Sequence, residues 1–213
     1  MSQFHSSKIR NIIFDLGGVL LNINPLLSLI ELSKVSGISQ DELRITLAGE
    51  QVFEKMDTGH LNSEQFRSEL CRIMNKKVSD SEMDRIWNVL LLDFPAPRVE
   101  LLQQLAKNYR VFLLSNTNLI HYIHYTREFQ MRYGIPMESL FERLFLSYEI
   151  GMHKPDAGIY KYVLQQSGIE ASESVFFDDS LANVQAAELQ GILGIYLQTG
   201  HEVTDYFQNG ILK

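Results

Sequence analysis

The sequence predicts an α/β fold in which a doubly wound parallel sheet carries an inserted all-helical segment. Two observations support this. Short apolar runs alternate with amphipathic helical patterns along most of the chain, as βα units do. One internal block, residues 22–92, contains helical patterns and no convincing strand. The chain is therefore expected to form a sheet-based core and a second, helical part.

Five apolar runs are the predicted strands. They cover residues 11–15, 110–114, 144–146, 175–178 and 194–197. Runs this short, followed at once by polar residues, are typical of parallel strands that helices cover on both faces. The sheet is therefore expected to be parallel and buried.

Three amphipathic patterns outside the insert are predicted helices that cover this sheet. They read RVELLQQLAKNY (98–109), DAGIYKYVLQQSG (156–168) and SLANVQAAELQG (180–191). The second and third end at Gly168 and Gly191, and glycine favours the left-handed conformation that often terminates a helix. A strand–helix alternation of this kind indicates parallel βαβ units.

The inserted block has four helical patterns of its own, each beginning near a serine or proline. They cover residues 25–37, 39–49, 63–75 and 79–91. The proline-containing segments INP and DFPAP flank the block. We therefore assign residues 1–21 and 93–213 to the core and residues 22–92 to a helical insert.

Composition narrows the function classes. The 213 residues carry a net charge of −7, which argues against broad binding to nucleic-acid backbone or anionic membrane. The single cysteine, Cys71, excludes an intrachain disulfide. The N-terminus MSQFHSSKIR has no apolar signal region, and no apolar run is long enough to span a bilayer. We expect a cytoplasmic protein with a small-molecule partner, without nucleic-acid or membrane partners, as a monomer or weak homodimer.

Polar residues follow four of the predicted strands. They are Asp15, Ser115, Asn116, Lys154, Asp178 and Asp179. Each has an ordinary interpretation taken alone, as a cap, a helix start or a solvated side chain. In open α/β sheets, however, the carboxyl ends of the strands meet at one edge, where ligands bind. The sequence therefore predicts a site at this edge.

The chemistry of these groups is complementary. Crowded carboxylates repel one another unless a cation is present, and Mg²⁺ prefers hard oxygen ligands together with a substrate phosphate. Lys154 supplies a positive charge, and the hydroxyl of Ser115 can bind phosphate oxygens. An aspartate carboxylate can attack phosphorus to form an aspartyl-phosphate. The group of residues thus suggests magnesium-assisted phosphoryl transfer.

Four motifs resemble those of the haloacid dehalogenase-like hydrolase superfamily, in matching order over nearly the whole chain. They are FDLGGVLLN, VFLLSNTN, GMHKPDAGIY and SVFFDDSLANVQAAELQG. The insert resembles the family's helical cap, and EKMDTGHLNSEQF resembles a glycine-containing turn and helix of that cap. The resemblance implies a Rossmann-like core, a helical cap and Mg²⁺ as cofactor.

The resemblance also implies residue roles. Asp15 matches the nucleophile and a metal ligand, and the backbone carbonyl of Gly17 matches a second metal ligand. Lys154 matches the charge-stabilising lysine, which also contacts substrate. The remaining positions are two pairs: Ser115 and Asn116 match the phosphate-binding pair, and Asp178 and Asp179 match the acidic pair that completes the metal site. Of that acidic pair, Asp179 is expected to coordinate directly.

Gly17 departs from the usual pattern of the family's phosphatases. Most of them have an aspartate there, which protonates the leaving group, and glycine cannot do acid–base work. The sequence resembles a bacterial subgroup that includes α-D-glucose-1-phosphate phosphatase and also lacks this aspartate. A sugar 1-phosphate has a better leaving group than an ordinary alcohol, so it depends less on an acid. We expect a phosphatase of small phosphorylated metabolites, such as a sugar 1-phosphate.

Two alternatives stay open. The chain could hydrolyse another bond, as dehalogenases and phosphonate hydrolases of the superfamily do. It could also bind a phosphorylated metabolite with little turnover and act as a regulator. Both follow from the missing carboxylate at Gly17.

Overall fold

The computed structural model describes residues 8–213. The first seven residues, which the prediction assigns to the core and reads as lacking a signal region, lie outside the described part. None of the helices from residue 8 onward is both long and apolar enough to cross a membrane.

Five parallel strands form the central sheet, in the order β3-β2-β1-β4-β5. Their bounds are β1 Asn11–Phe14, β2 Arg110–Ser115, β3 Arg143–Leu146, β4 Ser174–Asp178 and β5 Leu193–Tyr196. Each predicted strand is present, with ends shifted by a residue or so. The predicted fold class is confirmed.

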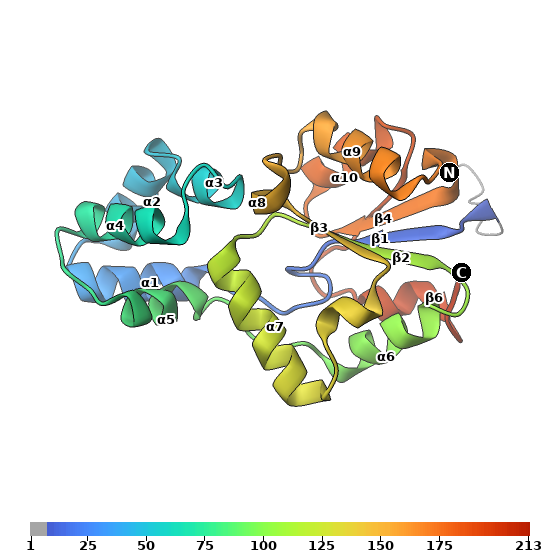
Figure 1. Cartoon of the computed structure of the whole chain (residues 1–213), viewed down its shortest axis with the longest axis horizontal. Helices are drawn as coiled ribbons and strands as arrows, with labels where there is room; N and C mark the ends of the chain where they lie inside the picture. Colours follow the sequence, from blue (N-terminus) through green and yellow to red (C-terminus); the bar gives the residue numbers. More distant parts are fainter. Residues whose placement is uncertain (1–7) are drawn as a thin grey trace.

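Helices cover both faces of the sheet (Figure 1). Helices α6 (Ala96–Leu105) and α7 (Leu119–Tyr133) lie on one face, and α9 (Ala157–Ser167) and α10 (Leu181–Glu188) on the other. Successive strand residues point to opposite faces. Within β1, Ile12 and Phe14 therefore join the hydrophobic cluster of α6 and α7, whereas Ile13 joins that of α9 and α10.

Several short elements complete the core. They are α8 (Ser147–Ile150), three 3₁₀ helices (Met137–Leu140, Ala171–Glu173 and Val203–Tyr206) and a hairpin of β6 (Phe207–Gln208) and β7 (Ile211–Leu212). The sequence pattern did not predict them, because elements of two to four residues are too short to show a period.

Five helices occupy the predicted insert. They are α1 (Pro25–Ser36), α2 (Gln40–Gly49), α3 (Val52–Asp57), α4 (Ser63–Met74) and α5 (Asp80–Asn88). Ser39 and Ser79 cap α2 and α5, and Asn62 forms a capping box with Gln65 at the start of α4. These helices enclose a hydrophobic cluster separate from those of the sheet, to which α7 contributes Ile120. We call residues 22–92 the cap; the division itself stays a prediction.

The two chain crossings between core and cap run side by side. The amide of Asn24 donates to the carbonyl of Leu90 at 2.8 Å, and the amide of Leu92 donates to the carbonyl of Asn22 at 2.9 Å. Arg98 of α6 also donates to the side chain of Asn22 at 3.0 Å. The paired crossings connect the cap to the core as a short ribbon.

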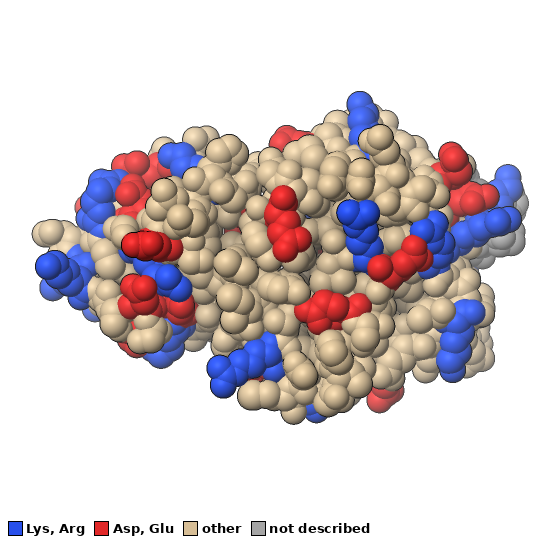
Figure 2. All heavy atoms as spheres, in the orientation of Figure 1, with Lys and Arg blue, Asp and Glu red and all other residues tan. Residues whose placement is uncertain are grey.

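Charges of both signs are interspersed over the face shown in Figure 2. On the cap, Arg67 pairs with Asp84 at 2.8 Å and Arg85 pairs with Glu82 at 2.8 Å. Exposed pairs of this kind contribute little stability individually. They do neutralise the surface charge locally.

Candidate active site

The carboxyl edge of the sheet brings together the predicted residues. From β1 the chain continues to β2 and β3 on one side and then to β4 and β5 on the other, so the strand order reverses at β1. Ligands of open α/β sheets bind at such a switch point. Asp15 follows β1, Ser115 ends β2 and Asp178 ends β4.

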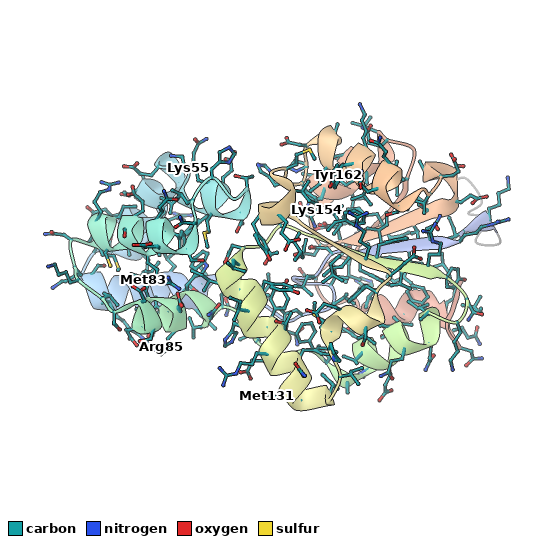
Figure 3. The ribbon with its side chains drawn as sticks, viewed as in Figure 1. Lys55, Met83, Arg85, Met131, Lys154 and Tyr162 are labelled. Carbon is teal, nitrogen blue, oxygen red and sulfur yellow. The ribbon has the colours of Figure 1, made fainter. Side chains whose placement is uncertain are left out.

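Lys154 is the centre of this group. Its ammonium Nζ lies 2.7 Å from Oδ1 of Asp15 and 2.7 Å from Oδ2 of Asp178. The lysine is only 3 % exposed. Burial lowers its pKa, but the adjacent carboxylates of Asp15 and Asp178 outweigh burial and hold the pKa above its usual value. Figure 3 shows Lys154 at the end of the sheet that faces the cap.

Asp178 is fully buried and its oxygens are occupied. Oδ1 accepts the backbone amide of Ser180 at 2.7 Å, and the side-chain amide of Asn183 donates to both oxygens, at 3.0 and 3.1 Å. Oδ2 also accepts from Lys154. Ser180 stands before α10, but its side chain makes no capping bond. Asn183 thus orients Asp178.

Three carboxylates lie close enough to share a cation. Asp15, Asp178 and Asp179 each offer an oxygen within 4.8 Å of the others. Asp179 is the exposed member of the three, and a Cβ on Gly18 would overlap its carboxylate, so only glycine fits beside it. Three carboxylates and one ammonium leave two negative charges. An all-oxygen donor set with that charge suits a divalent cation such as Mg²⁺.

The pKa of Asp15 shows what such crowding does. Burial and, to a lesser extent, the nearby Asp178 raise this pKa to about 7, although Lys154 lowers it. A carboxylate that must attack phosphorus has to be ionised. Any cation bound between these groups would favour the ionised form.

The side chain of Asn116 bonds to the backbone of Lys154. Its Nδ2 donates to the carbonyl of Lys154 at 2.9 Å, and its Oδ1 accepts the amide of Lys154 at 2.9 Å. The side chain therefore fixes the backbone that carries Lys154. Ser115 is buried at the end of β2, and Ser147 supports the next turn by bonding both backbone groups of Thr117.

Gly17 brings no side chain to the site, as the sequence shows. A Cβ built on it would lie 2.9 Å from Cδ1 of Ile23, the far end of a flexible side chain in the first crossing. Its φ is not in the left-handed region. A side chain at position 17 therefore needs only a small movement of Ile23.

The end of α3 forms the contact between cap and site. Nδ2 of Asn118 donates to Asp57 at 3.0 Å, and Nε2 of His153 lies 3.4 Å from Glu54. Asn118 is also the N-cap of α7, where its side chain accepts the backbone amide of His121. Burial raises the pKa of Asp57 to about 6, although the bond from Asn118 lowers it.

Gly59, just past α3, makes the closest approach to the core. Its φ is +72°, and a Cβ there would lie 2.5 Å from the carbonyl oxygen of Tyr148 in α8. Because backbone cannot move away easily, the turn accepts only glycine here. The predicted glycine turn of the cap thus rests directly against the core.

Replacing Gly59 with alanine should weaken the docking of the cap. We expect Gly59→Ala to lower the unfolding free energy by about 1–3 kcal/mol, from positive φ and the clash together, and to raise KM severalfold. Gly37→Ala is the matched control, since Gly37 has φ +77° and nothing within 4 Å of its Cβ position. Denaturant unfolding and steady-state kinetics would measure both. Equal effects in the two variants would mean that the contact with Tyr148 is unimportant.

Comparison with known proteins identifies the family. The profile of the haloacid dehalogenase-like hydrolases matches residues 9–191. The chain belongs to this family. It is similar to the solved HAD family enzyme BT-2542 of Bacteroides thetaiotaomicron, with 34 % identity, a TM-score of 0.89, and coverage of 94 % of this chain and 98 % of that one. A second structure of BT-2542 is a complex with magnesium and inorganic phosphate, at 33 % identity and a TM-score of 0.86; it covers 94 % of this chain and 100 % of that one.

Two curated relatives are phosphatases. A D-ribitol-5-phosphate phosphatase of Bacteroides thetaiotaomicron is 27 % identical and covers 86 % of this chain and 89 % of its own. A sesquiterpene phosphatase of Aspergillus oryzae is 28 % identical and covers 87 % and 88 %. This hydrolase thus resembles enzymes that act on organic phosphates of quite different polarity.

The sequence did not single out Asp57 or the other cap residues that face the core. Asp57 lies in the MDTG segment, for which the sequence predicts only a glycine-containing turn. His121 and Trp87 are both buried, and their rings stack with centroids 4.8 Å apart.

Proposed function

We propose that this hydrolase is a magnesium-dependent phosphatase of small phosphorylated metabolites, with Asp15 as nucleophile. The observation that carries the proposal is the buried ammonium of Lys154, shared at 2.7 Å by Asp15 and Asp178. It lies beside a three-carboxylate group that fits a divalent cation. The magnesium and phosphate bound in BT-2542 support the same chemistry.

In this mechanism, an oxygen of Asp15 attacks phosphorus, the bond to the organic oxygen breaks, and an aspartyl-phosphate forms. Water then attacks the phosphorus, releasing inorganic phosphate and restoring the carboxylate. Lys154 offsets charge on Asp15 and on the transferring group, and Ser115 is proposed to bind a phosphate oxygen through its hydroxyl. Asn116 acts by holding the backbone of Lys154. Bound Mg²⁺, held by Asp15, the carbonyl of Gly17 and the Asp178–Asp179 pair, would supply further charge neutralisation.

The sugar 1-phosphate remains the first substrate to test, because its leaving group needs an acid least. Similarity to the ribitol phosphatase favours a phosphorylated polyhydroxy substrate, whereas similarity to the sesquiterpene phosphatase favours an apolar substrate. The phosphonate-type alternative would need a cap lysine that forms a Schiff base in an apolar pocket. Lys76 and Lys77 of the cap are exposed. Lys34 pairs with Glu31 at 2.7 Å, and Lys55 donates to the exposed carbonyl of Glu50.

The missing acid gives a direct test of the mechanism. Across phosphate monoesters of rising leaving-group pKa, kcat/KM of the wild type should fall steeply, because the leaving oxygen departs without a proton donor at position 17. Gly17→Asp, made in an Ile23→Val background that removes Cδ1, should flatten this dependence. We expect it to speed alkyl phosphates by about 10- to 100-fold, within the usual range for one general acid, and to leave 4-nitrophenyl phosphate nearly unchanged.

Ile23→Val alone is the control for the lost methyl group. A shallow leaving-group dependence in the wild type would show that another group already donates the proton. Absence of phosphate release from every monoester would favour the regulatory alternative.

A further inference from the structure

The cap and the start of α7 enclose a cavity of about 510 Å³, within the range of small-molecule sites. Residues from α1, α2, α3, α5 and α7 line it. Leu29, Leu32, Leu47, Phe53 and Trp87 supply much of its wall. In Figure 1 the N-terminal end of α7 points toward these cap helices. The cavity is thus mainly apolar and lies between the two parts of the chain.

The polar residues of this wall bond to protein groups; among them Arg44, exposed on α2, pairs with Asp41 at 3.1 Å. Ser28 donates to the carbonyl of Trp87 at 2.9 Å, and Asp57 accepts from Asn118 at 3.0 Å. His121 bonds Asn88 at 2.9 Å through Nδ1, and burial lowers its pKa to about 3, so the ring is neutral. A hydroxyl-rich group would find few partners here, and unpaired hydroxyls are costly to bury.

One lining residue of the cavity, Asn118, lies in the loop that follows the strand end predicted to bind phosphate. It stands three positions after Ser115, which ends β2, and two after Asn116. At the opposite side, Leu26 and Ala48 line the cavity and are exposed to solvent. A ligand with its phosphate at the strand ends could therefore extend into the cap.

We infer that this cavity binds the apolar body of the substrate, so that a phosphate monoester with an aliphatic organic group binds more tightly than a sugar phosphate, whichever of the two has the better leaving group. The inference rests on the proposed function and narrows its substrate class. Removal of aliphatic carbon from water drives binding here, and each buried methylene adds to it. A plain sugar phosphate would then bind through its phosphate alone and show a higher KM.

Trp87 provides a reporter of occupancy. It is the only tryptophan of the chain, lines the cavity, and stacks on Phe53 with centroids 4.9 Å apart. Its indole Nε1 is buried and finds no hydrogen-bond partner among residues 8–213. Ligands in the cavity should change its fluorescence whether or not any phosphate is released.

The test uses the full chain carrying Asp15→Asn, which blocks turnover, with Mg²⁺ present. Hexyl phosphate, hexanol, glucose 1-phosphate and inorganic phosphate are titrated against Trp87 emission. We expect saturable changes with hexyl phosphate and hexanol, and a Kd for hexyl phosphate at least about tenfold below that of glucose 1-phosphate. Equal affinity for the two phosphates, without an emission change from hexanol, would overturn the inference.

A matched pair of variants places the binding in this cavity. Ala48 and Ile45 are both exposed on α2, but only Ala48 lines the cavity. With Asp15 intact, Ala48→Phe should raise KM for hexyl phosphate about tenfold, while Ile45→Phe should not. Inhibition by inorganic phosphate should be the same in both. Identical KM values in both variants would place the alkyl group elsewhere and overturn the inference.

The two proposals fail in different ways. Binding of hexanol and hexyl phosphate without any phosphate release would contradict the proposed phosphatase activity and still support the apolar binding site. Phosphate release with no preference for hexyl phosphate, and no change in Trp87 fluorescence, would contradict the apolar binding site and still support the phosphatase activity.

Discussion

Asp15→Asn is expected to lower kcat/KM for phosphate monoesters by about 10⁴-fold or more, the scale seen when a covalent nucleophile is removed. An amide cannot form the acyl-phosphate bond. The substitution nearly preserves shape, and its Oδ1 can still accept from Lys154, which stands 2.7 Å from the present carboxylate. Phosphate release under single-turnover conditions would measure the loss.

The controls for this variant are physical. The Tm of Asp15→Asn should stay within a few degrees of that of the wild type, because the ion pair between Lys154 and Asp178 remains. Denaturing mass spectrometry of the rapidly quenched wild type should detect a phosphorylated protein, and the variant should show none. Residual activity above about a tenth of the wild type would mean that water attacks phosphorus directly and that Asp15 only binds the cation.

The core half of the site could be predicted because each of its residues is marked locally. A buried strand followed by Asp15, or by Asp178, is visible in a few neighbouring letters. The parallel sheet then brings the strand ends together whatever lies between them. The bond from Asn183 to Asp178 is also local, since Asn183 lies in the first turn of α10, five residues after the strand end.

Asn116 shows where this reasoning stops. Its position after β2 predicts a role in binding phosphate. Its side chain, however, forms hydrogen bonds with both backbone groups of Lys154, 38 residues away. Such a contact depends on how two loops meet, which no local period encodes. The backbone amide of Asn116 stays available for the predicted role, so the assignment remains a proposal.

The cap half of the site is less predictable for a related reason. Helical periods in residues 25–91 show that helices will pack, but not what space their side chains leave. The cavity exists because five elements, including α7 of the core, converge around Trp87 and His121. Nothing in the sequence marks Asp57, which the bond from Asn118 connects to the site.

Lys154→Met should be the most damaging change to the stability of the folded chain. It removes the only ammonium that contacts Asp15 and Asp178 among the ion pairs of residues 8–213, leaving two buried carboxylates facing each other. Breaking a buried pair in this way typically costs about 3–5 kcal/mol. In metal-free buffer at pH 8 we expect a lower Tm, by on the order of 10 °C for a chain of this size, and loss of measurable turnover.

The dependence of stability on pH and on Mg²⁺ distinguishes the loss of the Lys154 charge from a simple packing defect. In the wild type Lys154 lowers the pKa of Asp15, against burial and Asp178. Without Lys154, the folded-state pKa of Asp15 rises further, so stability is present at low pH and lost as pH rises through that pKa. The difference in Tm between Lys154→Met and the wild type should therefore be small near pH 5 and largest near pH 8. A packing defect would give the same difference at both.

Magnesium should partly rescue the variant, because a divalent cation can replace the lost positive charge between the carboxylates. Millimolar Mg²⁺ is expected to raise the Tm of Lys154→Met more than that of the wild type, without restoring turnover. Lys161→Met, at an exposed position on α9, is the control and should change neither Tm nor its response to the ion. If Mg²⁺ stabilises wild type and Lys154→Met equally, the cation does not bind beside Lys154, and the metal site must be placed elsewhere.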